Sequence, residues 1–139
     1  MIAAALLLAQ AGVGASEVSP AAARGVVESY YAAIERGRYR AAYRLWSGDG
    51  AASGKGYAAF VRGFARTAHT RVVTGAARDR EGAAGSVYVT VPVVVVATLK
   101  DGARQRFRGS YTLRRVNGVP GATPSQRRWH IASARLRPV

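Results

Sequence analysis

The chain has 139 residues and a mass of 14.7 kDa, which is room for one domain with one hydrophobic core. Apolar residues make up 49% of it, a proportion typical of globular proteins and too high for a disordered one. There is no cysteine, which excludes disulfides, thiolate metal sites and cysteine nucleophiles.

The formal net charge is +14, from 21 basic and 7 acidic residues, and the only lysines are Lys55 and Lys100. A field of this sign favours anionic partners such as nucleic acid, acidic lipid head groups or acidic polysaccharide. A second interpretation stays open, because Ala, Gly, Val and Arg dominate the composition together, as a GC-rich genome would favour. The arginine excess is therefore either functional or compositional.

The N-terminus has the pattern of a secretory signal. An unbroken apolar run, Ile2 to Leu8, is followed by small residues that fit cleavage after Ala11 or Ala15, and we expect Ala15. The run is too short to span a bilayer, which takes about 20 apolar residues. No Lys or Arg precedes it, so an uncleaved anchor or a different start is an alternative.

This interpretation divides the chain into a signal peptide (1–15), a short linker (16–20) and a single domain (21–137). It predicts a bacterial protein of the periplasm or the exterior, with no transmembrane segment after signal cleavage. We find no internal repeat and no second linker.

Three helices are predicted in the first half of the domain. The first begins with Ser19 as N-cap and Pro20 at the first helical position, and Gly37 ends it. The second follows at once. The loop 47–54 then leads to a third helix, which we expect Ser53 to cap.

Each predicted helix carries apolar residues at helical spacing. They are Val27, Tyr30, Tyr31 and Ile34 in the first helix, Tyr39, Ala42, Tyr43 and Trp46 in the second, and Tyr57, Phe60, Val61 and Phe64 in the third. Gly63 falls inside the third helix and weakens it by about 1 kcal/mol relative to alanine.

From His69 onward the pattern is that of strands. The segment from His69 to Gly75 alternates poorly, Ser86 to Leu99 is rich in β-branched residues, and Arg104 to Val116 alternates clearly. A loop from Asn117 to Gln126 precedes a last strand, Arg128 to Leu136, which carries Trp129 and Ile131 on one face.

The turn after Leu99 decides the register of the long hairpin. A three-residue turn with Gly102 in the left-handed region pairs Leu99 with Ala103 and collects the apolar residues on one face. That face carries Val89, Val91, Val93 and Val95 opposite Leu113, Tyr111, Gly109 and Phe107.

Two residues of the hairpin break the pattern. Gly109, within the apolar face, indicates either a bend in the sheet or the close approach of a helix, and Pro92, on the polar face, indicates a bulge or an edge.

The segments from Val26 to Trp46 and from Arg127 to Ser133 resemble the opening helical pair and the terminal strand of the nuclear transport factor 2-like (cystatin-like) superfamily. The chain is most similar to small exported bacterial members of unassigned function. The resemblance implies an α+β fold, in which three N-terminal helices pack on the concave face of a curved, cone-shaped antiparallel sheet. This scaffold hosts isomerases, dehydratases, transport factors and exported proteins, so it implies no single function.

No catalytic residue is predicted. Enzymes on this scaffold place an Asp or His inside the cone, but none of the acids falls on the predicted inward face, and Asp49, Asp79, Glu81 and Asp101 are expected in glycine-flanked turns. His69 is expected to cap the third helix and His130 to lie on the surface. Two histidines without a matched carboxylate predict no metal site, and no cofactor motif is present.

Two sets of residues carry the binding hypotheses. The first is an apolar pocket for a small ligand, lined by Tyr43, Trp46, Phe60, Phe64, Phe107, Tyr111 and Trp129, whose alternative role is ordinary core. The second is an anion-binding stripe on the polar sheet face, formed by Arg104, Arg106, Arg108, Arg114 and Arg128, whose alternative role is a solvated face. His130 extends the stripe.

We therefore expect a non-enzymatic exported domain that binds a ligand or an envelope component. A small-molecule enzyme of the isomerase or dehydratase type and an anion-binding envelope protein are the alternatives. Because Tyr88, Pro92, Val94 and Val96 share the arginine-bearing face, a sheet-to-sheet homodimer is a further hypothesis.

Overall fold

The structure is a computed structural model that describes residues 15–139, so nearly all of the predicted signal peptide lies outside the described residues. The helical elements are η1 (Ala15–Val18), α2 (Pro20–Glu35), α3 (Tyr39–Arg44), η2 (Ala51–Ser53), α4 (Tyr57–Arg62) and α5 (Pro124–Arg127). The strands are β1 (Thr67–Thr74), β2 (Arg78–Ala83), β3 (Ser86–Leu99), β4 (Arg104–Val116) and β5 (His130–Pro138). No helix within residues 15–139 is long and apolar enough to cross a membrane.

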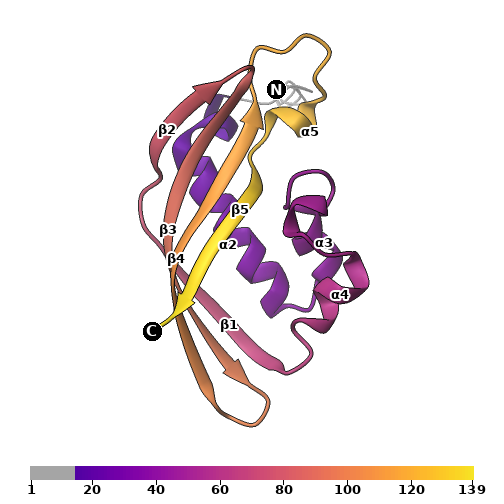
Figure 1. The fold of residues 1–139 in the computed structure, drawn as a ribbon, viewed down its shortest axis with the longest axis vertical. Helices are drawn as coiled ribbons and strands as arrows, with labels where there is room; N and C mark the ends of the chain where they lie inside the picture. The colour runs from indigo at the N-terminus through magenta and orange to yellow at the C-terminus, as the bar shows by residue number, and fades with distance from the viewer. Residues whose placement is uncertain (1–14) are drawn as a thin grey trace, which may run out of the picture.

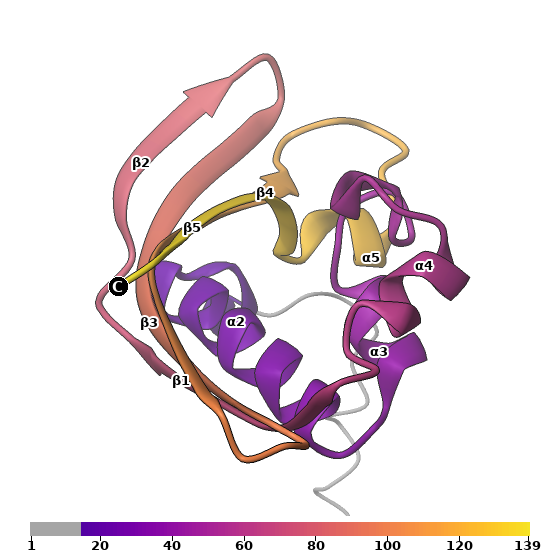
Figure 2. The ribbon, with the colours of Figure 1, turned by 60° about the horizontal axis from the view of Figure 1, so that its bottom comes forward.

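The described residues form an α+β fold, as predicted. The strands make one open five-stranded antiparallel sheet in the order β1-β3-β4-β5, and β2 pairs with β3 beyond the end of β1. The sheet curves around α2, and α3 and α4 lie together on the far side of α2 from β3 (Figures 1 and 2). Within residues 15–139, no helix lies on the convex outer side of the sheet (Figure 2).

The first helix begins and ends as predicted. The Ser19 side chain accepts the amide of Ala22, and Pro20 opens the helix. At its end the Arg38 amide donates to the Ala33 carbonyl while Gly37 has a φ of 72°, which is a Schellman ending.

The third helix differs from its prediction at both ends. It starts at Tyr57 with Gly56 as N-cap, and the Ser53 hydroxyl instead donates to the Gly50 carbonyl within the preceding turn. Gly63 lies just after the helix as its C-cap rather than in its interior. The serine forms a local turn because its short side chain reaches a nearby carbonyl more easily than a helix that starts four residues later.

The β3–β4 hairpin has the predicted turn and register. The Leu99 amide donates to the Ala103 carbonyl over 2.8 Å, and Gly102 has a φ of 90°. Val91 lies opposite Tyr111 and Val95 opposite Phe107, so the apolar face points to α2. A shift by one residue would have turned this face to water.

Gly109 lies at a close approach, as one of its two predicted causes requires, but the neighbour differs from the predicted helix. A Cβ atom at this position would lie 1.8 Å from the backbone oxygen of Arg135, so the close neighbour is strand β5 and not a helix.

Pro92 lies where β3 changes partner. Its carbonyl accepts the Gly75 amide, and β1 ends at Thr74 while β2 begins at Arg78. Because N–H and C=O of one residue point to the same side of an antiparallel strand, the missing proline N–H faces this break in the pairing.

The remaining strands correct the prediction in two places. Asp79 and Glu81 lie within strand β2 and not in turns, and α5 occupies part of the predicted loop from Asn117 to Gln126. His69 does not cap a helix, since it lies within β1. The predicted first and last strands exist, although β5 begins at His130 and continues to Pro138.

The segment after α3 closes the free edge of β5. Trp46 forms a parallel bridge with Ile131, whose amide donates to the Leu45 carbonyl and whose carbonyl accepts the Ser47 amide. The exposed backbone groups of β5 are thus paired at this point rather than left open to other chains.

Candidate functional site

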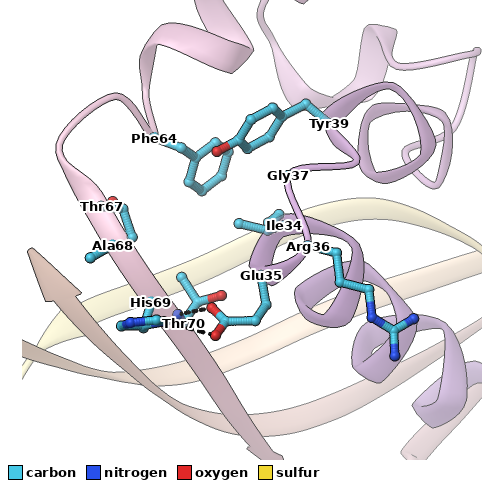
Figure 3. A pocket seen from close by; sticks show the side chains of 10 residues that line it. All are labelled: Ile34, Glu35, Arg36, Gly37, Tyr39, Phe64, Thr67, Ala68, His69 and Thr70. Atoms are coloured by element: carbon cyan, nitrogen blue, oxygen red, sulfur yellow. Dashed lines mark hydrogen bonds and ion pairs between the residues drawn. The ribbon is translucent and has the colours of Figure 1, made fainter.

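The two carboxylates of α2 hold strand β1 in place. Figure 3 shows Glu35 at the end of the helix, pointing at the strand: its oxygens accept the Thr70 amide over 2.8 Å and face His69 Nδ1 at 2.9 Å. These contacts, the Thr70 amide first, lower the pKa of Glu35. Two turns earlier in α2, Glu28 accepts a hydrogen bond from the Thr74 hydroxyl, which itself accepts one from Arg24.

This arrangement is a poor general base. Glu35 borders a hollow of about 270 Å³, but both of its oxygens are already hydrogen-bonded and its charge is stabilised (Figure 3). A carboxylate in this state has little tendency to take a proton from a substrate. Within residues 15–139 no group of three His, Asp or Glu side chains is placed to hold a metal ion.

The predicted pocket residues pack against one another. Tyr43, Trp46, Phe60, Tyr111 and Trp129 are at most 9% exposed, and Phe64 and Phe107 are half-buried. The Trp46 and Tyr111 rings are 6.3 Å apart, those of Tyr43 and Phe60 5.1 Å. Such ring-to-ring distances are those of a packed aromatic core.

The polar ends of the buried tyrosines also meet inside the core. The hydroxyls of Tyr31 and Tyr111 are hydrogen-bonded to each other. Burial raises the pKa of Tyr31 to about 12 and raises that of Tyr111 well above its usual range. These hydroxyls stay neutral and satisfy one another, as buried polar groups must.

The outer face of the sheet collects arginines from three strands. The register places Arg71 of β1 opposite Val96, which in turn lies opposite Arg106, and it places Arg108 directly opposite Arg137 of β5. We name as the arginine face the exposed residues Arg71, Arg104, Arg106, Arg108, Arg135 and Arg137. This face includes three of the predicted anion-binding residues and adds three that were not predicted.

No acidic residue neutralises the arginine face. The ion pairs within residues 15–139 join Glu17, Glu28, Glu35, Asp49 and Asp79 to other partners. Asp101 accepts the Ala103 amide in the hairpin turn, and Glu81 lies opposite Tyr88 near the other end of β3. Because the chain has only 7 acidic residues, the positive field over this face stands uncompensated.

Apolar side chains lie beside these arginines on the same face. Val73 of β1 is opposite Val94 of β3, and Val94 is opposite Arg108. Val73 is 71% exposed, and Val94 and Val96 are half-buried. The outer side of the sheet is therefore apolar at Val73, Val94 and Val96, and cationic at Arg71 beside them and over β4 and β5.

The missed arginines have a structural explanation. Strict alternation from Trp129 and Ile131 would turn Arg135 inward, but Ile131 pairs with Leu113 while Ser133 pairs with Thr112. The extra residue, Ala132, is a bulge that reverses the alternation of the rest of the strand. Arg71 was not predicted because in β1 threonines face inward while Val73 faces outward. The usual alternation of inward apolar and outward polar residues is therefore absent from this strand.

Two other predicted anion-binding residues lie apart from this face. Arg128 precedes β5 and pairs with Glu17 over 3.1 Å. Arg114 is on the outer face but near the end of β4, where its Nε donates to the Ser86 hydroxyl over 3.0 Å and it borders a cleft with His130.

One buried cation was not predicted. Arg115 faces inward and is 7% exposed, with its guanidinium 5.2 Å from the centre of the Trp129 ring. Burial and the charge of Arg80 lower its pKa. Its Nε makes no hydrogen bond with any described residue, so this end of the core is less apolar than the sequence pattern indicates.

Known proteins add no assignment to this geometry. No protein-family model matches the chain, and neither a curated protein nor a solved structure shows significant similarity to it.

Proposed function

We propose that this chain is a non-enzymatic binding domain whose arginine face attaches to an anionic lipid surface. One observation carries the proposal: Arg108 lies directly opposite Arg137, with Arg106 and Arg135 beside them, and no acid compensates the group. Like charges directly opposite in a sheet destabilise it. A surface of lipid phosphates removes that repulsion.

The shape and chemistry of the face favour a membrane over a nucleic acid. The exposed Val73 and the half-buried Val94 and Val96 lie beside the arginines and suit the boundary between head groups and acyl chains. The outer side of β3 carries Tyr88, but this residue lies opposite Arg114 and away from the arginine face, so among the described residues no aromatic ring for base stacking lies between those arginines. A lipid surface would contact both the valines and the arginines on the outer side of the sheet, whereas a polyanion would contact the arginines alone.

The other hypotheses find less support. A sheet-to-sheet homodimer would bring two uncompensated arginine faces together, which electrostatic repulsion opposes. An apolar ligand would have to displace the packed rings of Trp46 and Tyr111. An isomerase or dehydratase needs a base inside the cone, and the acids of α2 are engaged with β1 instead.

The proposal also covers where the protein is located and to which superfamily it belongs. Export through the N-terminal signal would place the domain beside the anionic lipids of a bacterial envelope. Membership of the nuclear transport factor 2-like superfamily is supported by the order of helices, long hairpin and closing strand that packs around α2.

Vesicle binding tests the proposal. We expect the full chain to co-sediment with phosphatidylglycerol vesicles and not with phosphatidylcholine vesicles. Replacement of Arg106, Arg108 and Arg137 by Gln should weaken binding roughly a hundredfold, since each basic residue at an anionic surface contributes about 1 kcal/mol. Salt should weaken it as well, because the charges are exposed.

A matched control separates this face from net charge. Replacement of Arg36, Arg62 and Arg66 by Gln removes the same charge from exposed positions outside the outer sheet face. This control should bind nearly as the unchanged chain does. Equal weakening in both triple variants, or tight binding to duplex DNA without binding to the vesicles, contradicts the proposal.

A further inference from the structure

A cleft of about 750 Å³ lies at the end of β4, away from the arginine face. Three segments that are distant in sequence form its walls: the residues after α3, the end of β4 with the start of β5, and α5. Figures 1 and 2 show α5 and the loop after α3 beside the end of the sheet. No Phe, Tyr or Trp of the described residues lines this cleft, and most of the residues that line it have polar side chains.

The Arg114 side chain is held at the cleft wall through its Nε atom, which leaves its two Nη atoms to bind a ligand. Its Nε donates to the Ser86 hydroxyl over 3.0 Å, which holds the guanidinium plane. No ion pair within residues 15–139 includes it. The two Nη atoms therefore present the paired donors that bind a phosphate or carboxylate in a bidentate way.

Gln126 supplies a second oriented donor. Its Oε1 accepts the Thr123 amide over 2.9 Å as part of a capping box. Because this bond requires the amide oxygen at that position, it fixes the orientation of the side-chain amide and hence the position of its NH₂ group. The serine hydroxyls of Ser47 and Ser125 also line the cleft.

The same wall adds a hydrogen-bond acceptor, because His130 pairs directly with Arg114 across β4 and β5. His130 Nδ1 lies 3.1 Å from the Arg128 carbonyl oxygen, which only accepts, so Nδ1 carries the proton. The other ring nitrogen, Nε2, is then an acceptor for a ligand hydroxyl when the ring is neutral. Arg44 and Asp49, 3.8 Å apart and well exposed, form a loose pair at the rim.

We infer that this cleft binds a small molecule that carries one phosphate or carboxylate group and a hydroxyl. The oxyanion lies against Arg114 and Gln126, and the hydroxyl donates to His130. The site is separate from the arginine face, so its failure leaves the membrane proposal standing and the reverse is also true.

Backbone and side-chain NMR shifts of the full chain test the inference, with inorganic phosphate, acetate, glycerol 3-phosphate and glycerol as probes. We expect saturable shifts at Gly48, Ser125 and the Gln126 NH₂ group, with glycerol 3-phosphate binding more tightly than phosphate and glycerol not binding. Tighter binding of acetate than phosphate would identify the ligand group as a carboxylate.

Two variants make the test specific. Arg114→Gln removes the paired donors, and Gln126→Glu keeps the capping oxygen while replacing the donor group by a negative oxygen. Each should weaken phosphate binding about tenfold or more, as expected for a hydrogen bond to a charged group. Arg62→Gln, at an exposed position of α4 outside both the cleft and the arginine face, should leave phosphate binding unchanged.

The inference is overturned if the unchanged chain shows no saturable shifts with any oxyanion. It is also overturned if folded Gln126→Glu binds phosphate as the unchanged chain does, or if the shifts map to the arginine face. Because Gln126→Glu retains the oxygen that caps the helix, we expect this variant to fold even if Arg114→Gln does not. The test then still has a readout.

Discussion

Single side chains in this protein join elements that lie far apart in the sequence. Glu35 links the end of α2 to β1 through the Thr70 amide and the His69 ring. These bonds stabilise the charged form of the carboxylate, so its pKa in the folded state is lower than the ordinary value of 4.5. The hydrogen bonds of Glu35 that hold β1 against α2 therefore also make the stability of the fold depend on pH.

Replacement of Glu35 by Gln should lower stability by about 1 kcal/mol or less at neutral pH, because the group is partly exposed. The contribution of Glu35 is complete above the unfolded pKa of 4.5 and is lost as pH falls through the lower folded value. Urea unfolding at pH 7 and in this acidic window should therefore show a difference that shrinks with acidification. Glu81→Gln is the control with the same change in charge, and a difference that stays constant with pH contradicts the assignment.

Elements whose residues alternate regularly were predictable, and elements that depend on an irregularity were not. The β3–β4 hairpin was predicted residue by residue, because only a three-residue turn keeps its valines on one face. Three features were not predictable: the Ala132 bulge, the turn that Ser53 makes in place of a cap, and the inward threonines of β1. Of the candidate sites, the β4 arginines were predicted, while those of β1 and β5 required the observed pairing.

The two arginines that face each other across β4 and β5 should lower the stability of the fold while they strengthen binding to anionic vesicles. Arg137→Gln removes a like charge directly opposite Arg108, so it should stabilise the fold by roughly 0.5 kcal/mol or less at low salt. The same change should weaken attachment to phosphatidylglycerol vesicles. Thermal unfolding and vesicle co-sedimentation of one variant measure both effects. A variant that loses stability at low salt would show that the arginine pair is not under repulsion.

The whole molecule has two sides of different character. Helices cover the concave side of the sheet (Figure 2) and enclose the aromatic core. No helix of the described part of the chain covers the convex side, which carries arginines next to valines. The six arginines of the arginine face thus lie on the side to which an anionic surface has access. The proposed attachment would bring the convex side of the sheet to the membrane, with the helices α3 and α4 pointing away from it.

The absence of cysteine allows this orientation to be measured directly with a single introduced thiol. Val73→Cys, labelled with a polarity-sensitive fluorophore, should show a blue shift in emission when the protein binds phosphatidylglycerol vesicles, because position 73 is 71% exposed on the convex side. Ala58→Cys, at an exposed position of α4, should show no shift under the same conditions. A blue shift at position 58, or bound protein with no shift at position 73, would contradict attachment through the arginine face.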